Sequence, residues 1–580
     1  MKRLFPFIII IILSYQSVGQ TEKGLNKEVE VVKPYKPTIR EAIKISDMPR
    51  FQPQDTERPD FDYNVHQQTE IAPKNLDNLE AEKVSTSKEY KPGIGLVRLG
   101  LGNYQLPYGE LFLNHQLSSA TTFGLNISHL NSVGKITLVN DDRVNAPSSE
   151  TNAELYINHY FDKITALGRI YFDRQAFRYY GYTGNKLDDF EKETRMQWWN
   201  KEQAFPTLGL EINLGGKTEL QNNFKYNGSL NIQHFETSTG QIENLLKISG
   251  RMEQEFEYFK GRLNMAICYV GADSIFNSSK SVFIKRNQTF LEAHPSVSIS
   301  TEEASLRVGF NSFLVLDPDD NDFLITPMAE ASWTPVKNML TLFAEINGFM
   351  RYNHYSAIAA ENRYVNPYHD AKNTKYPYIV GGGLRGRLNQ SLSYNLKGEY
   401  SSIKNHQFYI LQNQRVIDED FDIEEIKSNT FDIIYDDLKQ FSLGGEILYN
   451  HGNDWSLLFK AAHYTYDNNN EPYAWNLPGV EASLSFRYNM PVQPLRFTAD
   501  INFIGERKGL ERTLDNNDFT ATRIWNLPAI VDLSLGAEYK FSDQLSFWAK
   551  INNMTSEKYD KWQGYTNKRL NFIVGLSFSF

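Results

Sequence analysis

The last ten residues of the 580-residue chain, NFIVGLSFSF, alternate between apolar side chains and mostly small or polar ones. The apolar set is Phe572, Val574, Leu576, Phe578 and Phe580. A period of two predicts a β-strand with one apolar face. An unprotected edge of this kind invites aggregation in water, whereas in an outer-membrane barrel the last strand pairs with the first. The decamer therefore predicts an all-β fold, a transmembrane antiparallel up-and-down β-barrel.

The first 19 residues carry the pattern of a signal peptide. Lys2 and Arg3 precede the apolar run LFPFIIIIIL, and Ser17-Val18-Gly19 supplies small residues before a cut ahead of Gln20. The run is too short for a membrane-spanning helix, which needs about 20 residues. Because no Cys follows the predicted cut, a lipoprotein signal is excluded. We expect export and residence in the outer membrane of a Gram-negative bacterium.

Composition agrees with a barrel and excludes other classes. Phe, Tyr and Trp make up 13% of the chain, as two interfacial aromatic rings require. A net charge of −10 argues against binding to nucleic acid. Cys268 is the single cysteine, so no intrachain disulfide can form, and we interpret it as a small apolar filler within a strand.

Residues 20–91 differ from the rest of the chain. They are rich in Pro, Lys and Glu and show little periodicity, which predicts a periplasmic or lumen-occupying extension without a core of its own. From residue 92 to 580, alternating segments recur, for example at residues 495–503 and 531–541. Their polar faces carry charges that a dry core would not tolerate but a wet lumen accepts. We assign residues 92–580 to the barrel and expect no globular plug domain.

The lengths of the connections predict the topology. Outer-membrane barrels have short periplasmic turns and long extracellular loops, which here gives about 22 strands (range 16–22). Short turns are predicted near residues 119–120, 215–223, 335–338, 389–390, 450–454, 491–494 and 542–544. Long loops are predicted near residues 140–150, 179–204, 272–288, 351–374, 401–438, 505–528 and 554–569.

The last 60 or so residues resemble the end of TonB-dependent receptor barrels. Asn552-Asn553-Met554, Glu557-Lys558-Tyr559 and the final Gly575-Leu576 to Phe580 strand match the recurrent motifs of that family. The resemblance implies a 22-stranded barrel, and the terminal Phe resembles the signal read by the barrel-assembly machinery. Such receptors carry an N-terminal plug, which residues 20–91 do not resemble. Residues 27–32, KEVEVV, resemble a TonB box, but a plain linker is the favoured interpretation.

The sequence contains no motif that carries catalysis. HExxH, GxSxG, P-loop, CxxC and dinucleotide fingerprints are all absent, and the 11 His are scattered. We therefore predict no enzyme, no cofactor and no metal site. Asp317, Asp319 and Asn321 have the spacing at the start of a calcium loop, but the later Gly and Glu are missing, so a solvated acidic turn is favoured.

One predicted loop is rich in aromatic residues, from Tyr179, Tyr180 and Tyr182 to Trp198 and Trp199. Rings beside polar residues suit stacking on sugars or docking of a surface protein. The favoured interpretation is that the three tyrosines belong to the outer aromatic girdle.

Two functions follow from these features. The first is transport or passage of a nutrient or macromolecule across the outer membrane, with a periplasmic or surface-lipoprotein partner. The alternative is a structural scaffold in a larger outer-membrane complex. Because a 22-stranded lumen is wide, we expect residues 20–91, inward-folded loops or a partner protein to block it.

Overall fold

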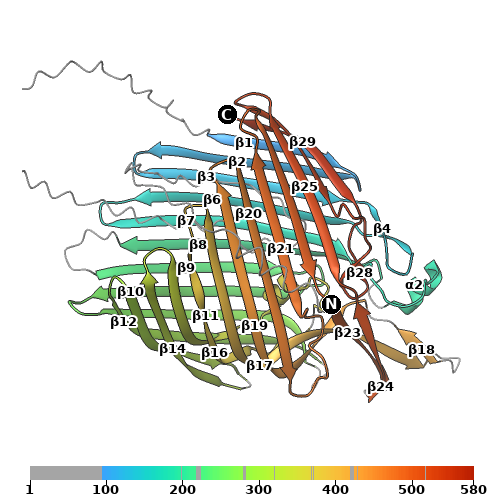
Figure 1. Cartoon of the computed structure of the whole chain (residues 1–580). Coiled ribbons are helices and arrows are strands. Elements are labelled where there is room, and N and C mark those ends of the chain that lie inside the picture. Colours follow the sequence, from blue (N-terminus) through green and yellow to red (C-terminus); the bar gives the residue numbers. More distant parts are fainter. Residues whose placement is uncertain are drawn as a thin grey trace, which may run out of the picture. The chain divides into compact units, whose positions relative to one another are not determined.

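Twenty-two strands pair antiparallel, each with the next along the chain, and form a closed barrel (Figure 1). The computed structural model describes residues 94–580 except 197–198, 217–223, 278–281, 319, 368, 370, 418–422, 427–428 and 516–517. The barrel strands are β1 (Gly95–Gly102), β2 (Leu106–Ser118), β3 (Thr121–Ser132), β6 (Ser148–Tyr160), β7 (Ile164–Arg178), β8 (Glu202–Gly216), β9 (Phe224–Glu236), β10 (Ile242–Glu255), β11 (Lys260–Asn277), β12 (Val282–Ser300), β13 (Ala304–Leu316), β14 (Asp322–Val336), β15 (Leu340–Arg351), β16 (Thr374–Arg387), β17 (Leu392–Ile417), β19 (Phe431–His451), β20 (Trp455–Asn468), β21 (Val480–Asn489), β22 (Leu495–Ile504), β25 (Ile530–Lys540), β26 (Leu545–Asn552) and β29 (Asn571–Ser579). The predicted number of 22 strands is confirmed.

The remaining elements lie in connections at the barrel end opposite the C-terminus (Figure 1). They are β4 (Lys135–Thr137), β5 (Arg143–Asn145), α2 (Asp189–Arg195), α3 (Tyr355–Glu361), β18 (Ile423–Ile426), β23 (Arg507–Asp515), β24 (Asp518–Leu527), β27 (Asp560–Trp562) and β28 (Tyr565–Thr566). Among the described residues, no helix is long and apolar enough to cross a bilayer.

The first and last strands close the ring, as the C-terminal decamer predicts. β29 pairs antiparallel with both β1 and β26, so neither the first nor the last barrel strand has a free edge. The Trp548 ring lies across this seam, where its strand register faces Gly575 and then Gly100. A Cβ on Gly100 would meet the Trp548 ring at 2.7 Å, and one on Gly575 would meet it at 2.5 Å. The two glycines therefore make the room that the indole occupies.

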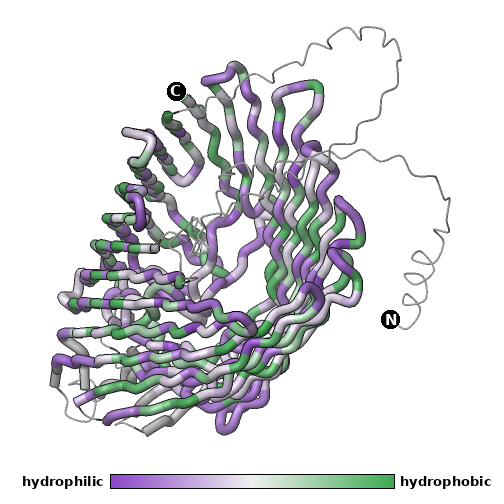
Figure 2. Tube along the Cα trace, turned by 90° about the vertical axis from the view of Figure 1, so that its left-hand side faces the viewer, coloured by the Kyte–Doolittle hydropathy of each residue, from purple (hydrophilic) through white to green (hydrophobic). Residues whose placement is uncertain are grey.

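The two faces of the barrel wall differ in polarity. Apolar and polar residues alternate along the strands (Figure 2). The apolar members of the C-terminal decamer point outward, with Phe572, Val574, Leu576, Phe578 and Phe580 each 43–52% exposed. Exposing such an apolar surface to water would be unfavourable, whereas contact with lipid is favourable. The barrel is therefore an outer-membrane barrel.

The lumen face carries both cationic and anionic side chains, which form ion pairs. Arg169 contacts Glu211 at 2.5 Å, and Arg307 contacts Glu330 at 2.8 Å. Lys397 on β17 lies 2.5 Å from Glu345 on β15, on the far side of β16. These charges are partly exposed and paired across strands, as a water-filled interior allows. The sequence prediction of a wet lumen agrees with this wall.

The connections alternate between short and long. At the end that holds both Ile94 and Phe580, described connections such as 119–120, 301–303 and 452–454 are tight turns. Two predicted long loops were wrong in kind: residues 272–288 and 401–438 are largely strand, since β11–β12 and β17–β19 continue as paired hairpins. Beyond the bilayer both faces of a hairpin meet water, so polar residues there do not mark a loop.

Candidate functional site: the closed extracellular end of the barrel

A cluster of buried apolar and aromatic side chains fills the mouth of the barrel at the end with long connections. We call it the extracellular cluster. Its members are Ile136, Leu138, Val144, Ala146, Phe177, Tyr179, Tyr180, Tyr182, Met196, Phe205, Phe235, Tyr355, Ile358, Ala359, Tyr364, Val365, Tyr409, Leu411, Phe431, Ile433 and Tyr565. Phe177, Phe205 and Phe235 lie on the lumen face of β7, β8 and β9, and the connections pack onto them. The extracellular loops therefore fold inward.

Three tyrosines meet within this cluster, and we call them the tyrosine junction. The rings of Tyr364 and Tyr565 stack with centroids 3.6 Å apart. Tyr180 meets Tyr565 edge-on at 5.1 Å and Tyr364 at 6.1 Å. The Tyr180 hydroxyl donates to the Thr566 carbonyl at 3.1 Å, and the Tyr565 hydroxyl donates to the Asn429 carbonyl. All three side chains are buried, with Tyr565 only 2% exposed.

The connections that carry these tyrosines are spread around the ring. Tyr180 follows the fifth barrel strand, Tyr364 the thirteenth and Tyr565 the twenty-first. The three connections are thus eight, eight and six strands apart around a circle of 22 strands. Connections that start from three such widely separated points of a cylinder can meet only by extending across its opening. The tyrosine junction therefore bridges the opening of the barrel.

This arrangement corrects the prediction for the aromatic loop. Tyr179, Tyr180 and Tyr182 do not belong to an outer girdle, because they are at most 8% exposed and lie in the extracellular cluster. Trp198 lies outside the described residues, and Trp199 packs against the cluster, 6.0 Å from the Tyr182 ring. The packing of separate loops on one another supplies more apolar contact than the membrane interface offers to single rings.

A buried ion pair ties two of the closing connections together. Lys192 on α2 lies 2.7 Å from Asp142, and the Tyr182 hydroxyl donates to the same carboxylate at 2.5 Å. Burial alone would raise the pKa of Asp142, but Lys192 and Tyr182 hold that pKa below its usual value. Asp142 and Lys192 are 3% and 5% exposed. The pair therefore fixes α2 against the β4–β5 hairpin.

Replacing Lys192 by Met is expected to destabilise the closed loops by about 3 kcal/mol, because the buried Asp142 carboxylate loses the nearer of its two cations and keeps only the exposed Lys186 at 3.9 Å. Protease cleavage of loops on intact cells measures the change. The double variant Lys192→Met with Asp142→Asn should lose less than the single one. Equal cleavage of wild type and Lys192→Met would contradict the role of this pair.

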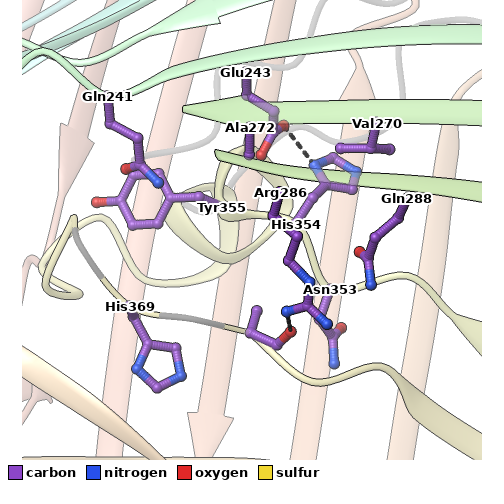
Figure 3. Close-up of a pocket in the computed structure, with 11 residues that line it drawn as sticks. Gln241, Glu243, Val270, Ala272, Arg286, Gln288, Asn353, His354, Tyr355 and His369 are labelled. Atoms are coloured by element: carbon purple, nitrogen blue, oxygen red, sulfur yellow. Dashed lines mark hydrogen bonds and ion pairs between the residues drawn. The ribbon is translucent and has the colours of Figure 1, made fainter. Parts of the chain in front are cut away.

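A second anchor holds the connection 352–373 against the barrel wall (Figure 3). His354 Nδ1 lies 2.7 Å from the Glu243 carboxylate of β10, and the Ser356 hydroxyl donates to the same carboxylate at 2.5 Å. Beside them is a cavity of about 30 Å³, which also borders Arg286 and His369. This volume suits one or two water molecules.

The same region changes the prediction for the acidic turn. Asp317 is not solvated, because it is 8% exposed and accepts hydrogen bonds from Arg286 at 2.7 Å and Gln288 at 2.7 Å. Asp319 lies outside the described residues. No group of three or more His, Cys, Asp or Glu side chains within the described part of the chain could hold a metal ion. The Asp317 carboxylate is thus committed to an arginine of β12.

The pKa values of the two histidines of this region are shifted in opposite directions. Burial, with Lys372 nearby, lowers the pKa of His369 to about 4, so this ring is neutral at pH 7. Burial alone would also lower the pKa of His354, but the Glu243 carboxylate raises it above the usual 6.5, against a smaller opposing effect of Arg351. The contact with Glu243 therefore favours the protonated form of the His354 ring.

Raising the pH is expected to loosen the connection 352–373. A histidine pKa that is raised on folding adds stability in full below the unfolded pKa of about 6.5, and this stability is lost as the pH rises through the folded pKa. Melting curves between pH 6 and pH 9 should therefore show a decline that Glu243→Gln abolishes. Identical pH profiles for the two proteins would contradict the ionic anchor.

Sequence reasoning missed one further residue of the closure. Glu511 of β23 is 7% exposed and accepts hydrogen bonds from Thr183 at 3.1 Å, Asn413 at 2.7 Å and Trp525 at 2.6 Å. It connects the Tyr180 loop to β17 and β24. A glutamate in an alternating polar segment carries no signal of this role, since two of its partners, Thr183 and Asn413, come from distant parts of the chain.

The comparisons with known proteins concern the fold. No protein-family model and no curated protein matches the chain. Among solved structures, the FrpB iron transporter from Neisseria meningitidis (F3-3 variant) is similar with a TM-score of 0.63 and 10% identity, over 84% of this chain and 82% of that one. The copper transporter OprC gives 0.60 and 11% identity over 84% and 80%. The FpvAI–pyocin S2 complex gives 0.61 and 11% identity over 84% and 73%.

The names of two of these neighbours describe them as transporters. At identities of 10–11% the likeness establishes the architecture. The expected absence of a plug concerns residues outside the described part of the chain. The chain has the 22-stranded outer-membrane barrel fold of TonB-dependent receptors.

Proposed function

We propose that the protein passes a hydrophilic solute across the outer membrane through its lumen, and that inward-folded extracellular loops close this route until they open. The observation that carries the proposal is the tyrosine junction, formed by three connections from opposite sides of the ring. A barrier made of loop side chains can open without any change in the strand pairing of the wall. Transport by proteins of the same fold supports the proposal.

The lumen wall favours a hydrophilic solute without selection for one sign of charge. Arg169, Arg307 and Lys397 each have a carboxylate within 2.8 Å. A wall whose charges are paired presents little net field to a passing solute. The scaffold alternative gains no support from the structural neighbours, whose names describe transport and reception of ligands.

The test is swelling of proteoliposomes in uncharged saccharides of increasing size. Full-length wild-type protein should give little swelling, whereas the variant Tyr364→Ala with Tyr565→Ala should admit glucose and small oligosaccharides. Heat-modified gel mobility checks that the vesicles contain folded protein. If the folded variant also gives no swelling, the proposal is overturned, because the lumen then offers no route.

Three further assignments are part of this proposal. Residues 1–19 act as a signal peptide and residues 20–91 as an extension, and both lie outside the described residues together with the segment 27–32. The barrel-assembly machinery recognises the outward-facing residues of the last strand, which are Phe572, Val574, Leu576, Phe578 and Phe580. A periplasmic or surface-lipoprotein partner assists transport, and pull-down of the native complex tests for it.

A further inference from the structure

A cleft of about 440 Å³ opens at the extracellular rim. We call it the rim cleft. Its walls come from the end of β20, from the connection 469–479 and from the start of β23. The volume lies within the 300–1,000 Å³ or so that is typical of sites for small molecules. The cleft is therefore large enough for a ligand of one or two sugar rings.

The lining combines aromatic rings with hydrogen-bonding groups. Tyr473 lines the cleft and is 43% exposed, with the Trp475 ring edge-on to it at 5.4 Å and the Lys508 ammonium over one ring face at 5.8 Å. Tyr466 lines it as well. Exposed tyrosine rings offer an apolar face at a low cost in conformational entropy, which suits the C–H face of a pyranose. The remaining lining is mainly polar, which disfavours an apolar ligand.

One acceptor in the cleft is open to a ligand. The Glu506 side chain is exposed, and no described hydrogen bond or ion pair engages its carboxylate. A ligand that contacts this carboxylate must bring hydrogen-bond donors. Hydroxyl groups do so without adding charge.

The rest of the lining is fixed in place by other contacts. Arg507 donates to the carbonyls of Asp560 and Lys561 at 2.8 Å and 2.7 Å. Glu471 accepts from Trp475 and Arg512, each at 2.8 Å. Such walls are preorganised, which lowers the entropy that binding costs. The lining holds the carboxylates of Asp467, Glu471 and Glu506 beside the cations of Arg507 and Lys508, so its charges nearly balance and favour neither sign of ligand.

From these observations we infer that the rim cleft binds a neutral, hydroxyl-rich saccharide, with Tyr473 as the stacking platform and Glu506 as an acceptor for ligand hydroxyls. The inference goes beyond the proposed function, because binding at the rim requires no passage through the lumen. It is therefore measured without transport, and its failure leaves the swelling experiment unaffected.

The experiment is binding of detergent-solubilised full-length protein to an array of neutral, acidic and amino oligosaccharides, followed by titration of the neutral saccharide that is retained best. Tyr473→Ala is expected to weaken binding roughly tenfold or more, whereas Tyr473→Phe, which keeps the ring, should bind like wild type. Glu506→Gln should weaken binding less. Tyr258→Ala is the matched control, since Tyr258 is 77% exposed on the turn between β10 and β11 at the other end of the barrel.

Three outcomes would overturn the inference. They are retention of no neutral saccharide, binding that Tyr473→Ala leaves unchanged, and a preference for amino sugars or spermidine over neutral saccharides. Folding of each variant is checked by heat-modified gel mobility, and Tyr473→Phe separates loss of the stacking ring from loss of the fold.

Discussion

The double variant Tyr364→Ala with Tyr565→Ala is expected to turn a closed barrel into a steadily conducting one. Each buried aromatic ring removed from packed surroundings costs the closed state about 3–5 kcal/mol. A change of about 3 kcal/mol already alters the ratio of open to closed molecules more than 100-fold. Planar-bilayer recordings of the full-length protein measure this directly, and cells that express the variant should become sensitive to large antibiotics.

Single variants and a control make this result specific. Tyr565→Ala should conduct more than Tyr180→Ala, because the Tyr565 ring stacks on Tyr364 and also contacts Tyr180 and Phe431. Tyr258→Ala, at the other end of the barrel, should conduct like wild type. A large steady current from the wild-type protein itself would refute the closure by loops.

The second large effect is expected at the seam between the first and last strands. A Cβ on Gly575 would overlap the Leu99 carbonyl oxygen and meet the Trp548 ring at 2.5 Å. The carbonyl belongs to the backbone of β1 and cannot move without breaking the pairing that closes the ring. Gly575→Val is therefore expected to reduce the amount of folded protein in the outer membrane roughly tenfold or more, since overpacking here also exposes two strand edges.

Gly228→Val provides the matched control for the seam. Gly228 lies on β9, and a Cβ there would have its nearest neighbour 3.9 Å away, the Ser249 carbonyl oxygen. This variant should reach wild-type levels and show the normal shift in mobility between boiled and unboiled gel samples. Folded Gly575→Val at the level of Gly228→Val would show that the seam tolerates a side chain.

The strands were predictable because their signal is local. Alternation over residues 531–541 or 571–580 depends on the lipid outside and the water inside, and each residue meets these solvents independently of distant partners. The pairing of β29 with β1 followed from the same reasoning, because closure is the general way to satisfy the last edge in a membrane.

The candidate site was not predictable in this way. Tyr180 was assigned to an outer girdle with Tyr179 and Tyr182, because tyrosines near a strand end are typical of the membrane interface. Its actual partners are Tyr364, Tyr565 and Thr566, and the last of these is 386 residues further along the chain. Asp317 was assigned to a solvated turn for a similar reason, since its partner Arg286 is on another strand.

The amino-acid sequence alone determined the solvent and the strand period and limited the number of strands to about 16–22, because these follow from the polarity of each residue and from the lengths of the connections. Only the tertiary structure decided which long connections fold into the mouth of the barrel and which side chains meet there. The physical reason is that contacts between connections across the mouth of the barrel depend on where every strand lies around the ring. No single segment of the chain specifies the positions of the other strands.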